Sequence, residues 1–358
     1  MIKIVIETNI TKMLGIKHPI ISAPMGPFYT TEIAIAVSEA GGLGVISHSS
    51  DFDRSVKENR GNINSTTDAM KKSMQKFVEH SDKPFGFNIR TSRVQIDAEI
   101  LCRKIPRFIM ENSKIKEQCM YVITSAGSSR TLPQSKTFQK LKESGSNIKH
   151  FHVAPALWLA DKCVANNVDG LVISGGEGGG HQSYEKVSSL VLLQQVVQKH
   201  PDFPIVACGG FATGQGLASA LSIGAGAVAM GSRFIASKEC EFHEDYKNIV
   251  PPAKAQDTLL VTGAFGPIRL WKNEYSLHHG LVTSKEEKMA QEKQLNMEQI
   301  LKDSRAYRMV YEGNTKDGAV LLGQSIGVIN DIKPIKEIID TTIADAEKYL
   351  KKASAYIK

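Results

Sequence analysis

The sequence contains few cysteines and few aromatic residues. Only 5 of its 358 residues are cysteine, and phenylalanine, tryptophan and tyrosine together make up 7%. The cysteines form no CxxC pair and show no metal-ligand spacing, which excludes a small disulfide scaffold and argues against a metal site. An odd number of scattered cysteines is typical of a reduced, intracellular protein. We therefore expect a cytoplasmic protein without a metal.

The sequence also lacks a long apolar run. Its longest uncharged stretch, residues 203–232, is interrupted repeatedly by glycine, which favours a buried strand–loop–helix–strand unit over a membrane span. Near the N-terminus, Lys3, Glu7 and Lys12 interrupt the apolar residues before the core of a secretory signal forms. We expect neither a membrane span nor a secretory signal.

Positive charge is in excess but is not concentrated. There are 44 basic and 37 acidic residues, a net charge of +7. Nucleic-acid binding requires a clustered basic stripe or a recognisable module. The lysines are instead spread through helical patterns that acidic residues interrupt, as on a solvated surface. We therefore expect no nucleic-acid partner.

What the sequence does contain is a recurring pattern of short apolar runs, each followed by glycine or polar residues and then a helical pattern. Runs that are apolar on both faces are typical of parallel strands in βα units. Eight strands are predicted, over residues 19–24, 43–47, 85–89, 121–126, 150–154, 171–174, 204–208 and 227–230. Eight βα units predict a (β/α)8 TIM barrel. A doubly wound sheet is the alternative, but the first strand is not followed by G-x-G-x-x-G.

Two stretches exceed the regular βα spacing. Residues 51–84 form a helix-containing excursion between the second and third strands, and residues 241–314 follow the eighth strand with a charged helical pattern. We interpret 1–240 as the barrel, completed by 315–358, and 241–314 as an inserted helical subdomain or lid. Shorter signals predict a helix that Thr213 caps and Gly224 ends.

Glycines gather where the predicted strands end, and in a TIM barrel these ends open on the face that carries the chemistry. Gly209 and Gly210 follow the seventh strand, and Gly231 and Ser232 follow the eighth. Glycine lets backbone N–H groups approach a ligand closely, and the following helix N-terminus attracts anions. These two loops often bind phosphate in this fold, so we predict a phosphate-bearing ligand; simple chain turning is the alternative.

A third glycine-rich segment, residues 175–180, follows the sixth strand and leads into His181. This places an imidazole at the rim of the strand ends, where it could act as an acid or base near neutral pH. His152, within the fifth strand, could face the mouth or the core, and the sequence leaves both open. His278 and His279 have no partner at metal-ligand spacing.

The ends of the first and third strands suit a flat aromatic ligand. Ala23, Pro24 and Met25 combine a rigid backbone with a soft apolar side chain. Asn88 carries an amide that can pair with a ring edge bearing both donors and acceptors.

Together these segments resemble the nitronate monooxygenase (2-nitropropane dioxygenase-like) family of FMN-dependent TIM-barrel enzymes, which also contains flavin-dependent enoyl-acyl-carrier-protein reductases. The resemblance runs from about residue 17 to 236 and resumes weakly at 323–325. It rests on pieces that occur in one order, namely HPIISAPM, AGGLG, FGFN, GEGGGH, ACGG and MGSR.

The resemblance implies non-covalently bound FMN at the barrel mouth, with His181 as the active-site histidine. The residues that would line the isoalloxazine ring are Ala23, Pro24, Met25 and Asn88. Those that would surround the phosphate and ribityl chain are Gly179, Gly209, Gly210, Gly231 and Ser232.

The activity implied first is that of a nitronate monooxygenase, which oxidises alkyl nitronates with O2 to a carbonyl compound and nitrite. An NAD(P)H-dependent enoyl-thioester reductase is the alternative, and a non-redox barrel that binds a phosphate ligand is the second alternative. Ser174 stands where Gln or Glu often occurs in the two enzyme groups and favours neither, and Ser183 replaces a common glycine. The expected partners are a small-molecule substrate and O2, and no feature decides whether the chain forms a homo-oligomer.

Overall fold

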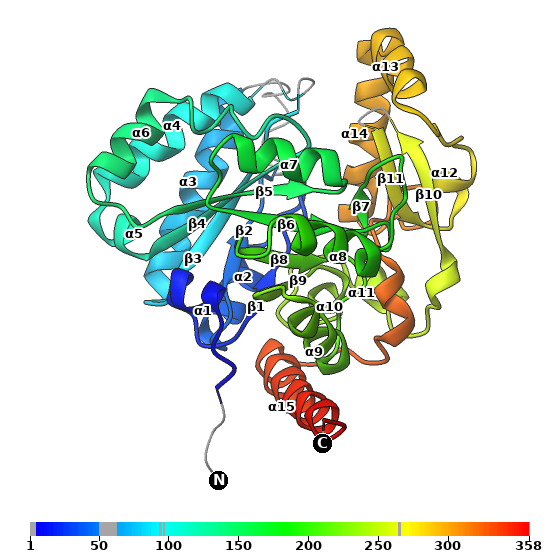
Figure 1. Ribbon diagram of the computed structural model, residues 1–358. Coiled ribbons are helices and arrows are strands. Elements are labelled where there is room, and N and C mark those ends of the chain that lie inside the picture. The colour runs from blue at the N-terminus through cyan, green and yellow to red at the C-terminus, as the bar shows by residue number, and fades with distance from the viewer. Residues whose placement is uncertain (1–4, 50–62, 93–94, 96, 264–265, 358) are drawn as a thin grey trace.

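Eight parallel strands form a closed barrel in the computed structural model, which describes residues 5–49, 63–92, 95, 97–263 and 266–357 (Figure 1). The strands, in the order in which they pair, are β1 (Ile20–Ser22), β9 (Ala227–Met230), β8 (Ile205–Cys208), β6 (Gly170–Ser174), β5 (Lys149–Ala154), β4 (Cys119–Ser125), β3 (Phe85–Arg90) and β2 (Gly44–Ile46). A parallel bridge between Ile21 and Leu43 joins β1 to β2. All eight predicted strands are present, and the TIM barrel is confirmed.

Residue alternation along the strands separates the barrel interior from the helix-facing side. The interior holds one apolar cluster that includes Ile21, Val45, Ile123, Phe151, Val172, Val206 and Ala229. Residues between these positions point outward because side chains alternate along a strand. On β3, for example, Phe85, Phe87 and Ile89 pack with the surrounding helices, so Asn88 and Arg90 face inward.

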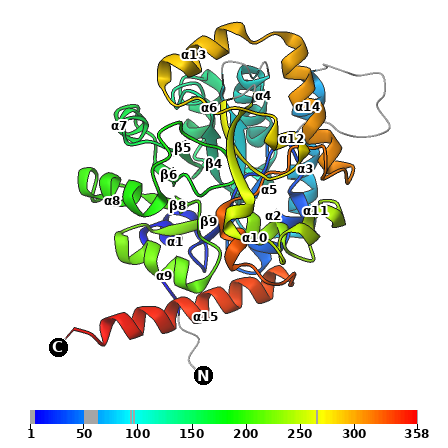
Figure 2. The same cartoon turned by 90° about the vertical axis from the view of Figure 1, so that its right-hand side faces the viewer.

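Helices surround the barrel, and the first of them closes one end, since its Ile10 and Leu14 belong to the interior cluster (Figures 1 and 2). They are α1 (Asn9–Leu14), α2 (Thr31–Glu39), α3 (Ile63–His80), α4 (Ala98–Glu111), α5 (Ser113–Gln118), α6 (Lys136–Glu143), α7 (Leu157–Ala165), α8 (Ser189–Lys199), α9 (Gly214–Ile223) and α15 (Ile335–Ser354). Thr213 caps α9 by accepting from the Gly216 N–H at 3.2 Å, and Gly224 ends it with φ +109°, as predicted. The predicted excursion 51–84 contains α3, and its residues 51–62 lie outside the described part of the chain.

The segment after β9 carries helices and also a β-hairpin. Its helices are α10 (Ser232–Ile235), α11 (Glu244–Ile249), η1 (Ala255–Asp257), α12 (Glu274–Leu277), α13 (Lys285–Gln294) and α14 (Met297–Tyr311). The hairpin strands are β10 (Thr258–Gly263) and β11 (Gly266–Trp271), so the insert is not wholly helical. β11 pairs in turn with β7 (Gly180–His181), in the loop after β6. The boundaries at 240 and 315 stay a prediction.

An aromatic cluster holds the insert against the barrel. Phe28 lies after β1, with its ring centroid 5.0 Å from that of Phe242 and 6.1 Å from that of Tyr311 at the end of α14. The Tyr246 hydroxyl on α11 donates to the Leu321 carbonyl at 2.6 Å. The chain then passes through η2 (Gln324–Val328) to α15, which lies beside α9 at the end of the molecule opposite α13 (Figure 2).

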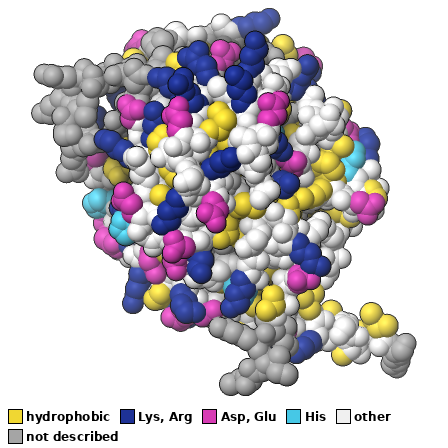
Figure 3. All heavy atoms as spheres, turned by 90° about the vertical axis from the view of Figure 1, so that its left-hand side faces the viewer, with side chains coloured by type: hydrophobic (Ala, Val, Ile, Leu, Met, Phe, Trp, Pro, Cys, Tyr) yellow, Lys and Arg dark blue, Asp and Glu magenta, His cyan; other side chains and the backbone are white. Residues whose placement is uncertain are grey.

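The surface carries both signs of charge. On the face in Figure 3, lysine and arginine side chains are interspersed with aspartate and glutamate. Exposed pairs such as Arg107–Glu111, with an N–O distance of 2.9 Å, contribute little stability each. None of the helices in the described residues is long and apolar enough to cross a bilayer.

Candidate active site

The loops after β8 and β9 present backbone donors that the protein itself does not use. Gly209 and Gly210 both have φ +86°, a conformation that glycine adopts without strain. Within the described residues, the N–H groups of Gly210 and Ser232 donate to no protein acceptor, whereas that of Gly209 is directed at the Cys208 thiol. Ser232 is buried, and a buried N–H group requires an acceptor. A phosphate would supply several acceptor oxygens at once.

The loop after β6 packs directly on the loop after β8. A Cβ atom at Gly209 would lie 3.0 Å from both the Gly175 oxygen and the Gly178 nitrogen. The Glu177 carboxylate fixes the first loop by accepting from the Ser189 N–H at 2.8 Å and from its hydroxyl at 3.0 Å. The two loops therefore form one rigid glycine-lined surface.

Gly179 contacts backbone from the C-terminal part of the chain. A Cβ atom at this position would lie 2.6 Å from the Gly323 nitrogen. The Gly323 N–H donates to the Ser232 hydroxyl oxygen at 3.1 Å. The structure thus brings Gly179 and Ser232 together through Gly323, a residue of the weakly resembling segment 323–325.

The end of β1 contacts the loop after β9. A Cβ atom at Gly231 would lie 3.8 Å from the Ala23 Cβ and 3.9 Å from the Met25 sulfur. The Met25 N–H donates to the Ser47 hydroxyl at 2.7 Å, and Pro24 lies between Ala23 and Met25 in the chain. An apolar surface from the first loop therefore adjoins the donors of the last loop.

Asn88 lies inside the barrel on β3 and is 2% exposed. Its Nδ2 donates to the Ile123 carbonyl at 2.9 Å and to the Ser125 hydroxyl at 3.3 Å. This fixes the amide and leaves its Oδ1 as the acceptor for a ligand donor.

His181 is held by the small sheet that joins the barrel to the insert, where it lies opposite Ile268 of β11. Burial lowers its pKa to about 4, and the positive charges of Arg90 and Lys288 add to this effect. The imidazole is therefore neutral near neutral pH. A neutral imidazole carries one N–H, so His181 can donate a hydrogen bond to a substrate oxygen but is not a cationic acid.

Three further polar residues lie beside this site and were not singled out from the sequence. His48 Nε2 lies 3.1 Å from Asp97 Oδ2, and the Arg90 backbone N–H donates to His48 Nδ1 at 3.0 Å. Burial and the Arg90 charge lower the pKa of His48 to about 4. Arg90 stands two residues after Asn88 on the same strand, so strand alternation could have placed it on the inner face.

His152 faces the core rather than the mouth, which decides between the two readings of the sequence. The Thr124 hydroxyl lies 2.7 Å from His152 Nδ1 and 2.7 Å from His150 Nε2. These side chains alternate with the interior residue Phe151. Burial lowers the pKa of His152 to about 4, so it packs as a neutral side chain between sheet and helices.

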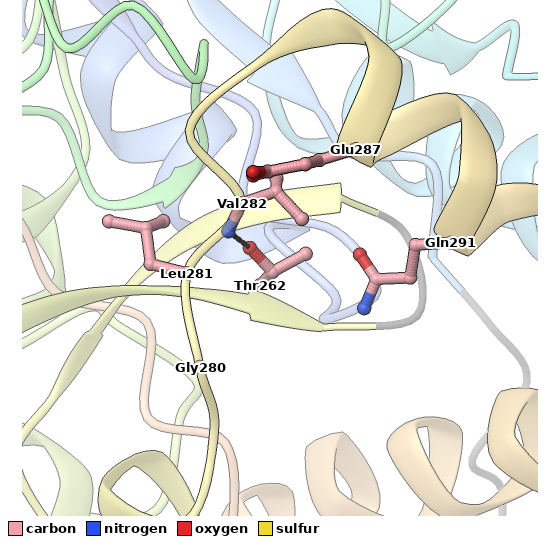
Figure 4. Close-up of a pocket in the computed structure, with 6 residues that line it drawn as sticks. All are labelled: Thr262, Gly280, Leu281, Val282, Glu287 and Gln291. Atoms are coloured by element: carbon pink, nitrogen blue, oxygen red, sulfur yellow. Dashed lines mark hydrogen bonds between the residues drawn. The ribbon is translucent and has the colours of Figure 1, made fainter.

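A separate cavity of about 270 Å³ lies within the insert (Figure 4). Glu287 and Gln291 of α13 line it together with Thr262 of β10 and residues 280–282. It contains none of the glycine-loop residues. Among the residues that the structure describes, no group of three or more His, Cys, Asp or Glu side chains could hold a metal.

The chain is similar to curated and solved proteins over most of its length. A (3aS,4S,5R,7aS)-5-hydroxy-7a-methyl-1-oxo-octahydro-1H-indene-4-carboxyl-CoA dehydrogenase of Mycobacterium tuberculosis is 27% identical over 99% of both chains. A probable nitronate monooxygenase of Staphylococcus saprophyticus is 26% identical over 75% of this chain and 80% of that one.

Among solved structures, FabK from Thermotoga maritima superimposes with a TM-score of 0.77 and 29% identity, over 98% of this chain and 100% of that one. A nitroalkane oxidase from Streptomyces ansochromogenes, at 19% identity and a TM-score of 0.68, covers 96% of this chain and 99% of its own and shares the fold. The family model described as nitronate monooxygenase matches residues 7–345. The chain therefore belongs to the nitronate monooxygenase family and is a flavin-type oxidoreductase.

Proposed function

We propose that this chain is an FMN-dependent oxidoreductase that acts on an acyl thioester. The choice of substrate rests on how much of this chain each group of relatives matches. The two CoA dehydrogenases match 99% and 96% of this chain, whereas the nitronate monooxygenases match 71–75% of it. FabK, an enoyl-acyl-carrier-protein reductase of the same family, also matches 98% of the chain.

The residues at the barrel mouth fit FMN. The unused N–H groups of Gly210 and Ser232 suit its phosphate, because backbone donors at strand ends bind phosphate without a lysine. Met25 offers an apolar surface to the ring, and Asn88 Oδ1 offers an acceptor to its polar edge. When bound, FMN supplies the hydride chemistry.

His181 would act on the carbonyl oxygen of the thioester. When the carbon β to that carbonyl receives a hydride, negative charge develops on the oxygen, and a donor placed there stabilises the transition state. A pKa of about 4 keeps His181 neutral, so it would serve as an N–H donor to that oxygen. The proton that completes the reduction at the α carbon then comes from another donor or from water.

The nitronate monooxygenase activity is the second candidate. The family model carries that description, and a nitronate is a planar anion. The positive charges of Arg90 and Lys288, which lower the pKa of His181, would favour such an anion near the imidazole.

Anaerobic titration of the purified protein separates these candidates. Bleaching of the flavin absorbance by NADH or NADPH, followed by its return on addition of crotonyl-CoA, supports the thioester oxidoreductase. Bleaching by ethyl nitronate but not by NADH or NADPH supports the monooxygenase. A colourless protein that takes up no added FMN contradicts both and favours a non-redox phosphate-binding barrel.

A further inference from the structure

We propose that Arg90 binds the negatively charged oxygen of the substrate, beside His181. The inference rests on the proposed function, and it concerns a residue to which neither the family description nor the sequence motifs give a role. Arg90 ends β3 and shares the inner face of the barrel with Asn88. Its Cζ atom lies 3.9 Å from where a Cβ atom of Gly26 would stand, so the guanidinium reaches the loop that carries Met25.

The Arg90 side chain is half-buried and lacks a full set of protein partners. In the described part of the chain its Nε has no hydrogen-bond partner and is shielded from solvent. Arg269, by contrast, donates from Nε to the Gly176 carbonyl at 2.8 Å and from Nη1 to the Thr258 hydroxyl at 3.0 Å. Arg233 shares an unpartnered Nε in the described residues, but it donates from Nη1 to Asp331 at 2.9 Å and from Nη2 to the Ala236 carbonyl at 2.7 Å. A buried charged donor without an acceptor is costly, and an anionic ligand would remove that cost.

The Asp97 carboxylate, whose charge raises the pKa of Arg90, does not pair with it directly. Both oxygens of Asp97 are engaged elsewhere, with Oδ2 at 3.1 Å from His48 Nε2 and Oδ1 at 2.7 Å from Gln95 Nε2. Hydrogen bonds from His48 and Gln95 outweigh the opposing effect of burial and lower the pKa of Asp97, so it stays charged. Asp97 therefore balances the charge of Arg90 at a distance and leaves its N–H groups for a ligand.

Elements of the insert enclose the same space. Besides burial, the charges of Arg90 and of Lys288 on α13 lower the pKa of His181. Burial raises the pKa of Tyr307 on α14, so its hydroxyl stays protonated and uncharged. The charge of Arg90 thus acts on His181, and a substrate oxygen bound by both groups would lie between them.

Arginine suits a delocalised oxyanion because its planar fork offers parallel N–H donors. Two substrates share that chemistry. A nitronate carries its charge before reaction, whereas a thioester carbonyl becomes an enolate oxygen only as the hydride arrives. An interaction made with a ground-state anion affects binding, and one made only in the transition state affects the rate.

The test uses the flavin-loaded protein and two probes. Calorimetry measures the dissociation constants of propanoate, a planar two-oxygen anion, and of propanamide, its neutral isostere. Rapid mixing measures the binding and reaction of crotonyl-CoA with the reduced enzyme. The variants are Arg90→Met, which removes the charge, Arg90→Lys, which keeps it without the fork, and Arg107→Met as an exposed control on α4. Thermal unfolding verifies that each variant folds.

We expect Arg90→Met either to weaken the binding of propanoate or to slow the reaction of crotonyl-CoA, in each case by about tenfold to a hundredfold. Weaker binding of propanoate but not of propanamide identifies a ground-state anion, and slower reaction of crotonyl-CoA at unchanged affinity identifies the enolate. A folded Arg90→Met protein that differs from the unmodified enzyme by less than about threefold in both assays overturns the proposal. If crotonyl-CoA fails to react with the unmodified enzyme, the proposed thioester activity is refuted. The comparison of propanoate with propanamide then decides the role of Arg90 by itself. If Arg90→Met does not fold, Arg90→Lys is judged by the same criteria, with a smaller loss expected.

Discussion

Gly209 and Gly210 offer a matched pair of substitutions that separates backbone strain from packing in the phosphate loop. Both residues have φ +86°, so alanine at either position incurs the penalty of a left-handed backbone, about 1–2 kcal/mol. Their surroundings differ. A Cβ atom at Gly210 would meet nothing closer than Glu177 Cβ at 3.6 Å, whereas one at Gly209 would lie 3.0 Å from backbone atoms of Gly175 and Gly178.

We therefore expect Gly210→Ala to lower the free energy of unfolding by about 1–2 kcal/mol. Gly209→Ala adds overpacking against backbone that cannot rotate away, which costs about 1–3 kcal/mol more. Because relief of that contact requires the loops after β6 and β8 to separate, the dissociation constant of FMN should rise about tenfold or more in Gly209→Ala.

Urea denaturation followed by circular dichroism gives the stability of each variant, and quenching of FMN fluorescence gives its affinity. Equal stability losses in the two variants would refute the packing argument. A Gly209→Ala protein that binds FMN as tightly as the unmodified chain would refute the placement of the phosphate.

Three other results are expected. The His181→Asn protein should retain FMN, measured by its visible absorbance, but lose most turnover, since asparagine places its amide differently; unchanged turnover would leave His181 a structural role. The free energy of unfolding should fall as the pH drops from about 6.5 to about 4, because His48 and His152 have pKa values near 4 in the folded chain and so take up protons at a higher pH in the unfolded chain. The expected loss is up to roughly 3 kcal/mol for each histidine. Urea midpoints that do not change over this pH range would contradict the prediction. Gly179→Ala should destabilise the protein by about 1–3 kcal/mol in thermal unfolding, because its Cβ would lie 2.6 Å from the Gly323 nitrogen, and an unchanged midpoint would count against that contact.

The barrel could be predicted from the sequence because its signals are local. Each strand is a short apolar run, and the cap of α9 by Thr213 requires only neighbouring residues. The pairing of the β10–β11 hairpin with β7 could not be predicted in the same way. The hairpin's outer partner is His181, which pairs with Ile268 from a distant part of the chain, and nothing local indicates that contact.

In the candidate site, too, the residues with local sequence signals were predicted and those placed by tertiary contacts were not. The glycine loops were predicted because the fold places all strand ends on one face. Arg90 was missed because a charged residue at a strand end is usually exposed, and its contact with the loop at Gly26 depends on the tertiary fold. Alternation with the interior residue Phe151 would have placed His152 outside the barrel.

The central claim is that backbone N–H groups of the loops after β8 and β9 hold the phosphate of a flavin. The most direct test compares the dissociation constants of FMN and riboflavin, which differ by that phosphate alone. Several hydrogen bonds to a charged group predict that FMN binds about a hundredfold tighter or more. Equal affinity for the two flavins would contradict the claim.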